Sequence, residues 1–105
     1  MGSGNIFEQL PADFKDEVFE KLLESESVRI ERIISKGHSS PAQGWYDQTE
    51  NEWVMVLQGQ AIINFEAGDE VVLKPGSYLN IPAHRKHRVK WTTSDVETIW
   101  LALFY

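Results

Sequence analysis

The chain has no cysteine among its 105 residues, which excludes disulfide bonds and any chemistry that needs a thiolate. It is also poor in positive charge: Lys and Arg total 10 against 16 Asp and Glu, giving a formal net charge of −6. Such an acidic balance disfavours general binding to nucleic acid or to an anionic membrane surface. The sequence has neither a long hydrophobic run nor a signal-peptide core, so we expect a cytoplasmic protein without a membrane partner.

The remaining composition is that of one globular domain. Hydrophobic residues make up 42% of the chain and charged residues 25%, which is ordinary for a folded protein. A chain of this length can enclose a single core but not two.

The N-terminal segment, residues 1–27, carries a helical pattern. In "LPADFKDEVFEKLLES", the apolar residues Phe14, Val18 and Leu22 recur at every fourth position. Phe19 and Leu23 widen this stripe on the same side. The spacing therefore predicts one amphipathic helix over about residues 12–24.

From residue 28 onward the hydrophobic period changes to two. Short alternating runs are separated by turn signals, among them the Pro75-Gly76 pair that is typical of a type II turn. This pattern predicts an all-β fold over residues 28–105, an antiparallel sandwich or a small barrel. The exception is "SKGHSSPAQGWYDQTEN", residues 35–51, whose length is typical of a binding loop.

Strand alternation places three polar side chains on apolar faces. His87 shares a face with Val89 and Trp91, Glu52 lies on the face of the valines that follow it, and Arg32 lies between two isoleucines. Buried polar groups of this kind are costly unless they are paired or used. The alternatives to a functional site are a hydrogen-bonded core histidine, an ion pair between Glu52 and Arg32 across the barrel, and bulged strands on which these two side chains face outward.

Two segments together resemble the motifs of the cupin superfamily, in particular its small single-domain members. "NEWVMVLQG" has Glu52 and Gly59 at the spacing of the first cupin motif, and "GSYLNIPAHRKH" has Gly76, Pro82 and His87 at that of the second. The resemblance covers roughly residues 28–105. It implies a small antiparallel jelly-roll β-barrel with His87 and Glu52 at metal-ligand positions.

The first motif departs from the family pattern because its two histidines are replaced. In one alignment of the gap, Trp45 and Asp47 stand at these positions, and in the other Tyr46 and Gln48 do. Two of the four ligands that the family usually supplies therefore remain.

A metal site would need at least one more ligand beside Glu52 and His87. Asp47 is the best candidate, followed by His84 if the turn after Pro82 folds it back, with Gln48 third. The expected ion is a divalent manganese, iron or zinc, the harder ions being favoured by an oxygen-rich set. The alternative is a barrel that has lost its metal and keeps a plain binding cavity.

The sequence thus supports two functions. The first is a small metal-dependent enzyme, such as an isomerase or dioxygenase, in which Arg32 receives a substrate carboxylate while Trp45, Tyr46 and Gln48 contact the small organic ligand. The second is a metal-free module that binds or senses such a ligand without turnover. The apolar C-terminal run "TIWLALFY" also predicts that its second face is covered, either by the N-terminal helix or by another subunit in a homodimer.

Overall fold

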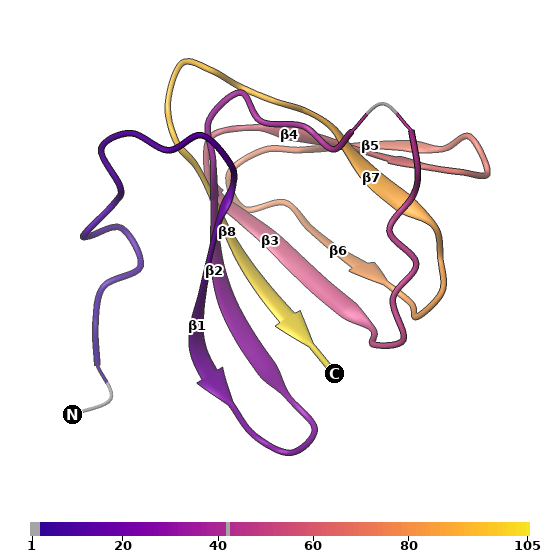
Figure 1. Cartoon of the computed structure of the whole chain (residues 1–105), viewed down its shortest axis with the longest axis horizontal. Coiled ribbons are helices and arrows are strands. Elements are labelled where there is room, and N and C mark those ends of the chain that lie inside the picture. The colour runs from indigo at the N-terminus through magenta and orange to yellow at the C-terminus, as the bar shows by residue number, and fades with distance from the viewer. Residues whose placement is uncertain (1–2, 42) are drawn as a thin grey trace.

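Two antiparallel sheets face each other in the computed structural model, which describes residues 3–41 and 43–105 (Figure 1). The larger sheet has the order β1-β2-β8-β3-β6 and the smaller one the order β5-β4-β7. The strands span β1 Val18–Glu24, β2 Arg29–Ser35, β3 Glu52–Gln58, β4 Ala61–Phe65, β5 Glu70–Leu73, β6 Tyr78–Ile81, β7 His87–Thr92 and β8 Thr98–Phe104. This arrangement confirms the all-β prediction.

The turns between strands form where glycine permits a left-handed backbone. Gly76 has a φ of 91°, and the N–H of Ser77 donates to the carbonyl of Lys74 over 2.8 Å, as the predicted type II turn requires. Gly59, after β3, has a φ of 84° and lies so close to β8 that an added Cβ would come within 2.7 Å of the Cα of Thr98. Gly59, the glycine of the first cupin motif, is therefore needed because only glycine tolerates both this φ and this close approach.

The predicted helix over residues 12–24 is wrong. Residues 18–24 form strand β1, which pairs antiparallel with β2 in a hairpin closed by the hydrogen bond from the N–H of Ser25 to the carbonyl of Val28. The edge of β2 offers a full ladder of backbone partners, and this long-range pairing overrides a local helical pattern that is only about three turns long.

The prediction that Trp91 shares the inward face of His87 is wrong, because a β-bulge lies between the two residues. The pairing of β4 with β7 shifts by one residue at Lys90, so that Ile63 pairs with Val89 but Ile62 with Trp91. Beyond this bulge the alternation changes sides. Trp91 consequently lies 42% exposed, whereas His87 and Thr92 are buried.

The hydrophobic core lies between the sheets. Its members come from facing strands of both, and include Val54, Ile63, Phe65, Trp100 and Phe104. Val54 and Val56 are buried on β3, which confirms that Glu52 shares the inward face of that strand. The described residues contain no helix that is long and apolar enough to cross a membrane.

Candidate functional site

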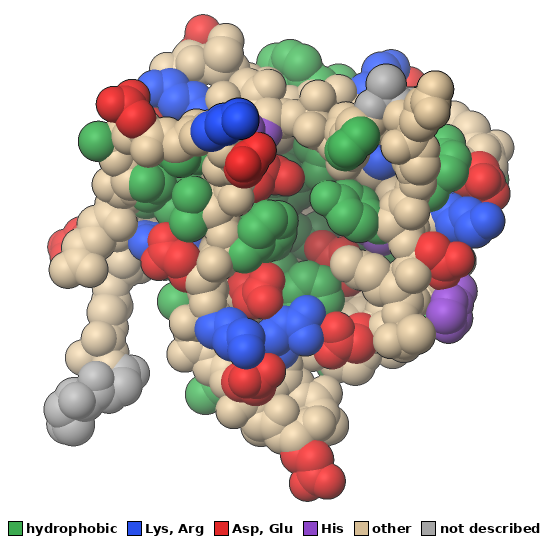
Figure 2. Space-filling view, viewed as in Figure 1, with side chains coloured by type: hydrophobic (Ala, Val, Ile, Leu, Met, Phe, Trp, Pro, Cys, Tyr) green, Lys and Arg blue, Asp and Glu red, His purple; other side chains and the backbone are tan. Residues whose placement is uncertain are grey.

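A cavity of about 90 Å³ opens between the two sheets. The view in Figure 2 looks onto the side where hydrophobic side chains gather around a central recess. Its walls are mostly apolar and aromatic, with a few polar groups, as in most small-molecule sites. The lining residues are Glu17, Phe19, Ile33, Tyr46, Gln48, Glu52, Val54, Ile63, Ile81, His87, Val89, Trp100 and Phe104.

His87, the first residue of β7, is held in one tautomer. Its Nδ1 lies 2.8 Å from the carbonyl oxygen of Arg85. Because a carbonyl can only accept, Nδ1 carries the proton and donates it. The lone pair of the neutral ring is therefore on Nε2, which lies 3.6 Å from Oε1 of Glu52.

The Glu52 carboxylate has no hydrogen bond within the described part of the chain, although only 12% of its side chain is exposed. Burial of the imidazole opposes its protonation, but the nearby Glu52 carboxylate and the Arg85 carbonyl outweigh this effect and raise the pKa of His87. The pair can therefore hold a proton between Nε2 and the carboxylate.

The loop before β3 brings two more polar side chains to the cavity. Tyr46 forms an isolated β-bridge with His87, and their ring centroids lie 5.7 Å apart. Gln48 lines the cavity beside them. Of the two alignments of the first motif, the structure thus brings the Tyr46 and Gln48 pair to Glu52 and His87.

Two cavity residues, Glu17 and Phe19, were missed by the sequence interpretation because they fell in the predicted helix. Glu17 accepts a hydrogen bond from the hydroxyl of Ser35, which in turn accepts the indole N–H of Trp100 over 3.0 Å. Side chains two positions apart on a strand point to the same face, so the spacing of Glu17 and Phe19 was the one sign that both could line a cavity.

Arg32 does not reach the cavity. It is 5% exposed, and its guanidinium donates to the carboxylate of Glu20 over 2.9 Å. It also donates to the backbone carbonyls of Ile6, Glu8 and Gln9. Arg32 therefore joins the N-terminal segment to the outer face of the sheet, and it pairs with Glu20 rather than with Glu52.

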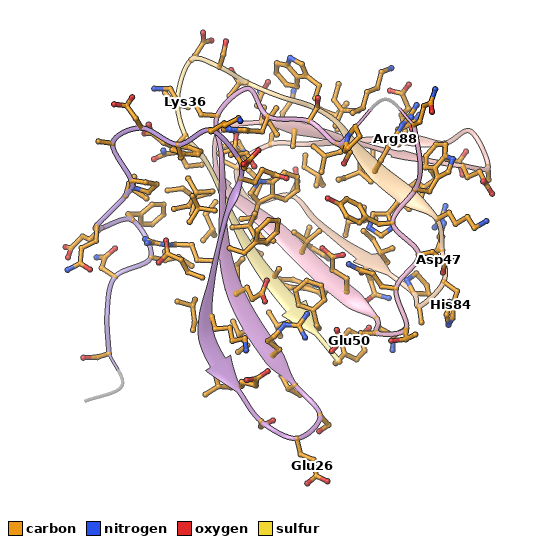
Figure 3. The ribbon with its side chains drawn as sticks, in the orientation of Figure 1. Glu26, Lys36, Asp47, Glu50, His84 and Arg88 are labelled. Carbon is orange, nitrogen blue, oxygen red and sulfur yellow. The ribbon has the colours of Figure 1, made fainter. Side chains whose placement is uncertain are left out.

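The predicted ligands Asp47 and His84 meet each other away from the cavity. Nδ1 of His84 lies 2.8 Å from Oδ1 of Asp47, and their side chains are 65% and 43% exposed respectively. Figure 3 shows both pointing outward at the edge of the molecule. Trp45 also lies outside, with the Arg88 guanidinium 4.5 Å from its ring centre.

The residues at the cavity do not fit a resident metal ion. Glu52 and His87 supply one carboxylate and one imidazole, and Tyr46 and Gln48 beside them are weak metal ligands. Glu17, the other cavity carboxylate, accepts a hydrogen bond from Ser35 and does not converge with this pair. Within residues 3–41 and 43–105, no three His, Asp or Glu side chains converge as a metal-binding group. Catalytic ions in proteins usually have three such ligands.

Comparisons with known proteins agree with this architecture. A protein from Ralstonia eutropha JMP134, described as a "putative mannose-6-phosphate isomerase", has a TM-score of 0.93 and 46% identity over 97% of this chain and 95% of its own. A cupin superfamily protein from Desulfitobacterium hafniense DCB-2 has a TM-score of 0.73 at 22% identity, covering 90% of this chain and 82% of its own.

A third structure, an RmlC-like cupin protein from Desulfovibrio desulfuricans, has a TM-score of 0.73 at 21% identity over 97% of this chain and 95% of its own. No significant match was found among curated proteins. The cupin domain family matches residues 31–104, from β2 to the end of β8. This match covers most of the sequence, and the chain therefore belongs to the cupin domain family.

Proposed function

We propose that this protein binds a small organic molecule in the cavity between its sheets, using Glu52 and His87 as the polar anchor and no resident metal ion. The observation that carries the proposal is the Glu52 carboxylate, which lies against an apolar cavity with the His87 imidazole 3.6 Å away and no closer hydrogen-bond donor among the described residues. A buried carboxylate in this state is unfavourable, and a ligand that donates to it removes the penalty.

The donor set argues for metal-free binding. The cavity keeps one carboxylate and one imidazole side by side, and Nε2 of His87 is directed to Glu52. The ligand would lie against apolar side chains of both sheets, such as Ile33 and Ile63, with Tyr46 and Gln48 at the mouth. Arg32 has no part in this proposal, because its guanidinium is committed to Glu20 and to backbone carbonyls.

The test is a fragment screen on chelator-treated protein, read by NMR at the Trp100 indole N–H and the His87 ring, together with elemental analysis. We expect fragments of a few non-hydrogen atoms to shift both signals equally before and after chelation, and Glu52→Gln and His87→Asn to weaken binding. The matched control is His84→Asn, which keeps a residue tolerant of the positive φ of 64° at an exposed site. Stoichiometric metal that the two cavity variants lose would contradict the proposal.

A second candidate is isomerisation by proton transfer. Nε2 of His87 is the free base position of a buried pair, and a base of this kind can remove a proton from a carbon next to a carbonyl and return it to a neighbouring atom. The 46% identical protein from Ralstonia eutropha is also described as an isomerase. Glu52 would hold the protonated ring in place during the transfer.

Solvent deuterium distinguishes catalysis from binding alone. Metal-free protein in heavy water should incorporate deuterium next to the carbonyl of dihydroxyacetone, a small uncharged substrate, and His87→Asn should abolish the exchange. Binding without any exchange above that of the variant would remove the isomerase candidate and retain the binding module.

A further inference from the structure

The charge of the cavity residues restricts what the cavity can accept. Its lining includes the carboxylates of Glu17 and Glu52 and the imidazole of His87, and no Lys or Arg. Among the described residues, Glu52 has the His87 imidazole as an ion-pair partner at 3.6 Å, whereas Glu17 accepts a hydrogen bond from Ser35 and has no ion pair. Even with His87 protonated, these three groups sum to one negative charge, so a ligand with its own carboxylate or phosphate would be repelled.

The apolar walls add a second restriction. Four aromatic rings line the cavity, and rings of this kind attract cations as well as apolar groups; one of them, Phe104, already has the Arg29 guanidinium 4.2 Å from its centroid. The volume of about 90 Å³ limits the enclosed part of a ligand to a few non-hydrogen atoms. The rings belong to Phe19, Tyr46, Trp100 and Phe104.

We propose that the ligand is a small organic amine, bound as its ammonium ion. Its N–H groups donate to the Glu52 carboxylate beside the His87 imidazole, and its carbon atoms lie against Ile33, Ile63 and Trp100. Glu17 at the cavity wall adds a second negative charge and makes the site selective for cations. This inference rests on the proposed function and names the ligand class of the same cavity.

Glu17 lies outside the part of the chain that matches the cupin domain family. It lies in the segment before β1, whereas the cupin domain match begins at residue 31. Its carboxylate is fixed by Ser35, which is fully buried and is itself fixed by Trp100. The N-terminal segment thus supplies a positioned charge to a cavity whose other acidic residue, Glu52, lies on β3.

The experiment compares three probes of similar shape, n-butylamine, n-butanol and butyrate, in NMR titrations at pH 7 and constant ionic strength. We expect n-butylamine to shift the Trp100 and His87 signals with an affinity about tenfold tighter than n-butanol, a difference of about 1.4 kcal/mol. Butyrate should bind more weakly than n-butanol.

Two variants test the charges separately. Glu17→Gln retains an oxygen that accepts from Ser35 but removes the charge, and should weaken n-butylamine binding severalfold while leaving n-butanol binding unchanged. The matched control is Asp16→Asn, which removes the same charge from the adjacent exposed residue, outside the cavity lining, and should change neither. Glu52→Gln should bring the affinity for the amine down to that for the alcohol.

Three results would overturn the inference. Butyrate or n-butanol binding as tightly as n-butylamine would refute the ammonium ligand and leave the binding cavity supported. Equal losses of n-butylamine affinity in Glu17→Gln and Asp16→Asn would show that Glu17 acts only through the net charge of the protein and not as part of the cavity. If none of the three probes moves the Trp100 or His87 signals, both the inference and the proposed function fail.

Discussion

Arg32 and Glu52 are both buried charges on strands, but the fold treats them differently. The Arg32 guanidinium donates to one carboxylate and three carbonyls, so its burial joins two parts of the chain. The Glu52 carboxylate faces a cavity with one imidazole at 3.6 Å. A charge paired with a carboxylate and several carbonyls indicates a structural role, whereas a carboxylate that faces a cavity with a single imidazole beside it indicates a site where a ligand binds.

Replacing Arg32 should therefore affect stability rather than ligand binding. Arg32→Met leaves Glu20 and the carbonyls of Ile6 and Glu8 without their donor, and we expect a loss of about 2–3 kcal/mol, moderated because Glu20 is partly exposed. Lys21→Met, which breaks an exposed pair with Glu24, should cost less than about 1 kcal/mol. Urea unfolding measures both. An unchanged urea midpoint in Arg32→Met, together with weaker binding of carboxylate ligands, would show that Arg32 binds ligand and is not structural.

Alternation along single strands predicted the orientation of Glu52 and His87 but not that of Arg32. On β3, and on β7 before its bulge, the residues of one face are more buried than those of the other, so polarity indicates the direction. On β2 the residues Arg32, Ile33 and Ile34 are all buried, because the N-terminal segment covers the outer face. Where both faces are covered, the hydrophobic pattern no longer tells inside from outside.

Among the elements, β1 shows most clearly what a local pattern leaves out. Phe14 and Val18 have helical spacing, but Phe14 stacks on His38 at 5.0 Å between ring centres while Val18 begins a strand opposite Ile34. The partner of β1 is set by the position of β2 in the sheet, which the pattern of residues 12–24 does not contain. For the same reason, the sequence pattern did not identify Glu17 and Phe19 as cavity residues.

The connection from β3 to β4 gives a prediction at the scale of an element. Gly59→Ala should destabilise the fold by about 3 kcal/mol, because its φ of 84° is unfavourable for alanine and the new Cβ meets the backbone of Thr98. Gly68→Ala is the matched control. It also has a positive φ, 113°, but open space around it, and should cost about 1 kcal/mol. Equal losses in thermal or urea unfolding would contradict the close approach of β3–β4 to β8.

At the scale of the whole molecule, the buried pair links stability to pH. The pKa of His87 is raised in the folded protein, so the attraction to Glu52 stabilises the fold fully below the unfolded imidazole pKa of about 6.5. This contribution is lost as the pH rises through the higher folded pKa. The free energy of unfolding should therefore fall across that window in the wild-type protein.

Urea unfolding at a series of pH values measures this slope. Glu52→Gln should flatten it, because the amide no longer favours the protonated ring. The other two histidines are present in both proteins, so the comparison isolates the pair of His87 and Glu52. A slope that is the same in wild type and Glu52→Gln would show that the two side chains do not interact.

Nitrogen NMR of the His87 ring tests the central claim most directly, that Nε2 of a buried imidazole faces the Glu52 carboxylate across the cavity. We predict that the neutral ring carries its proton on Nδ1, that the pKa of His87 lies above the ordinary histidine value, and that Glu52→Gln lowers it. A neutral ring protonated on Nε2, with a pKa that Glu52→Gln leaves unchanged, would contradict the account.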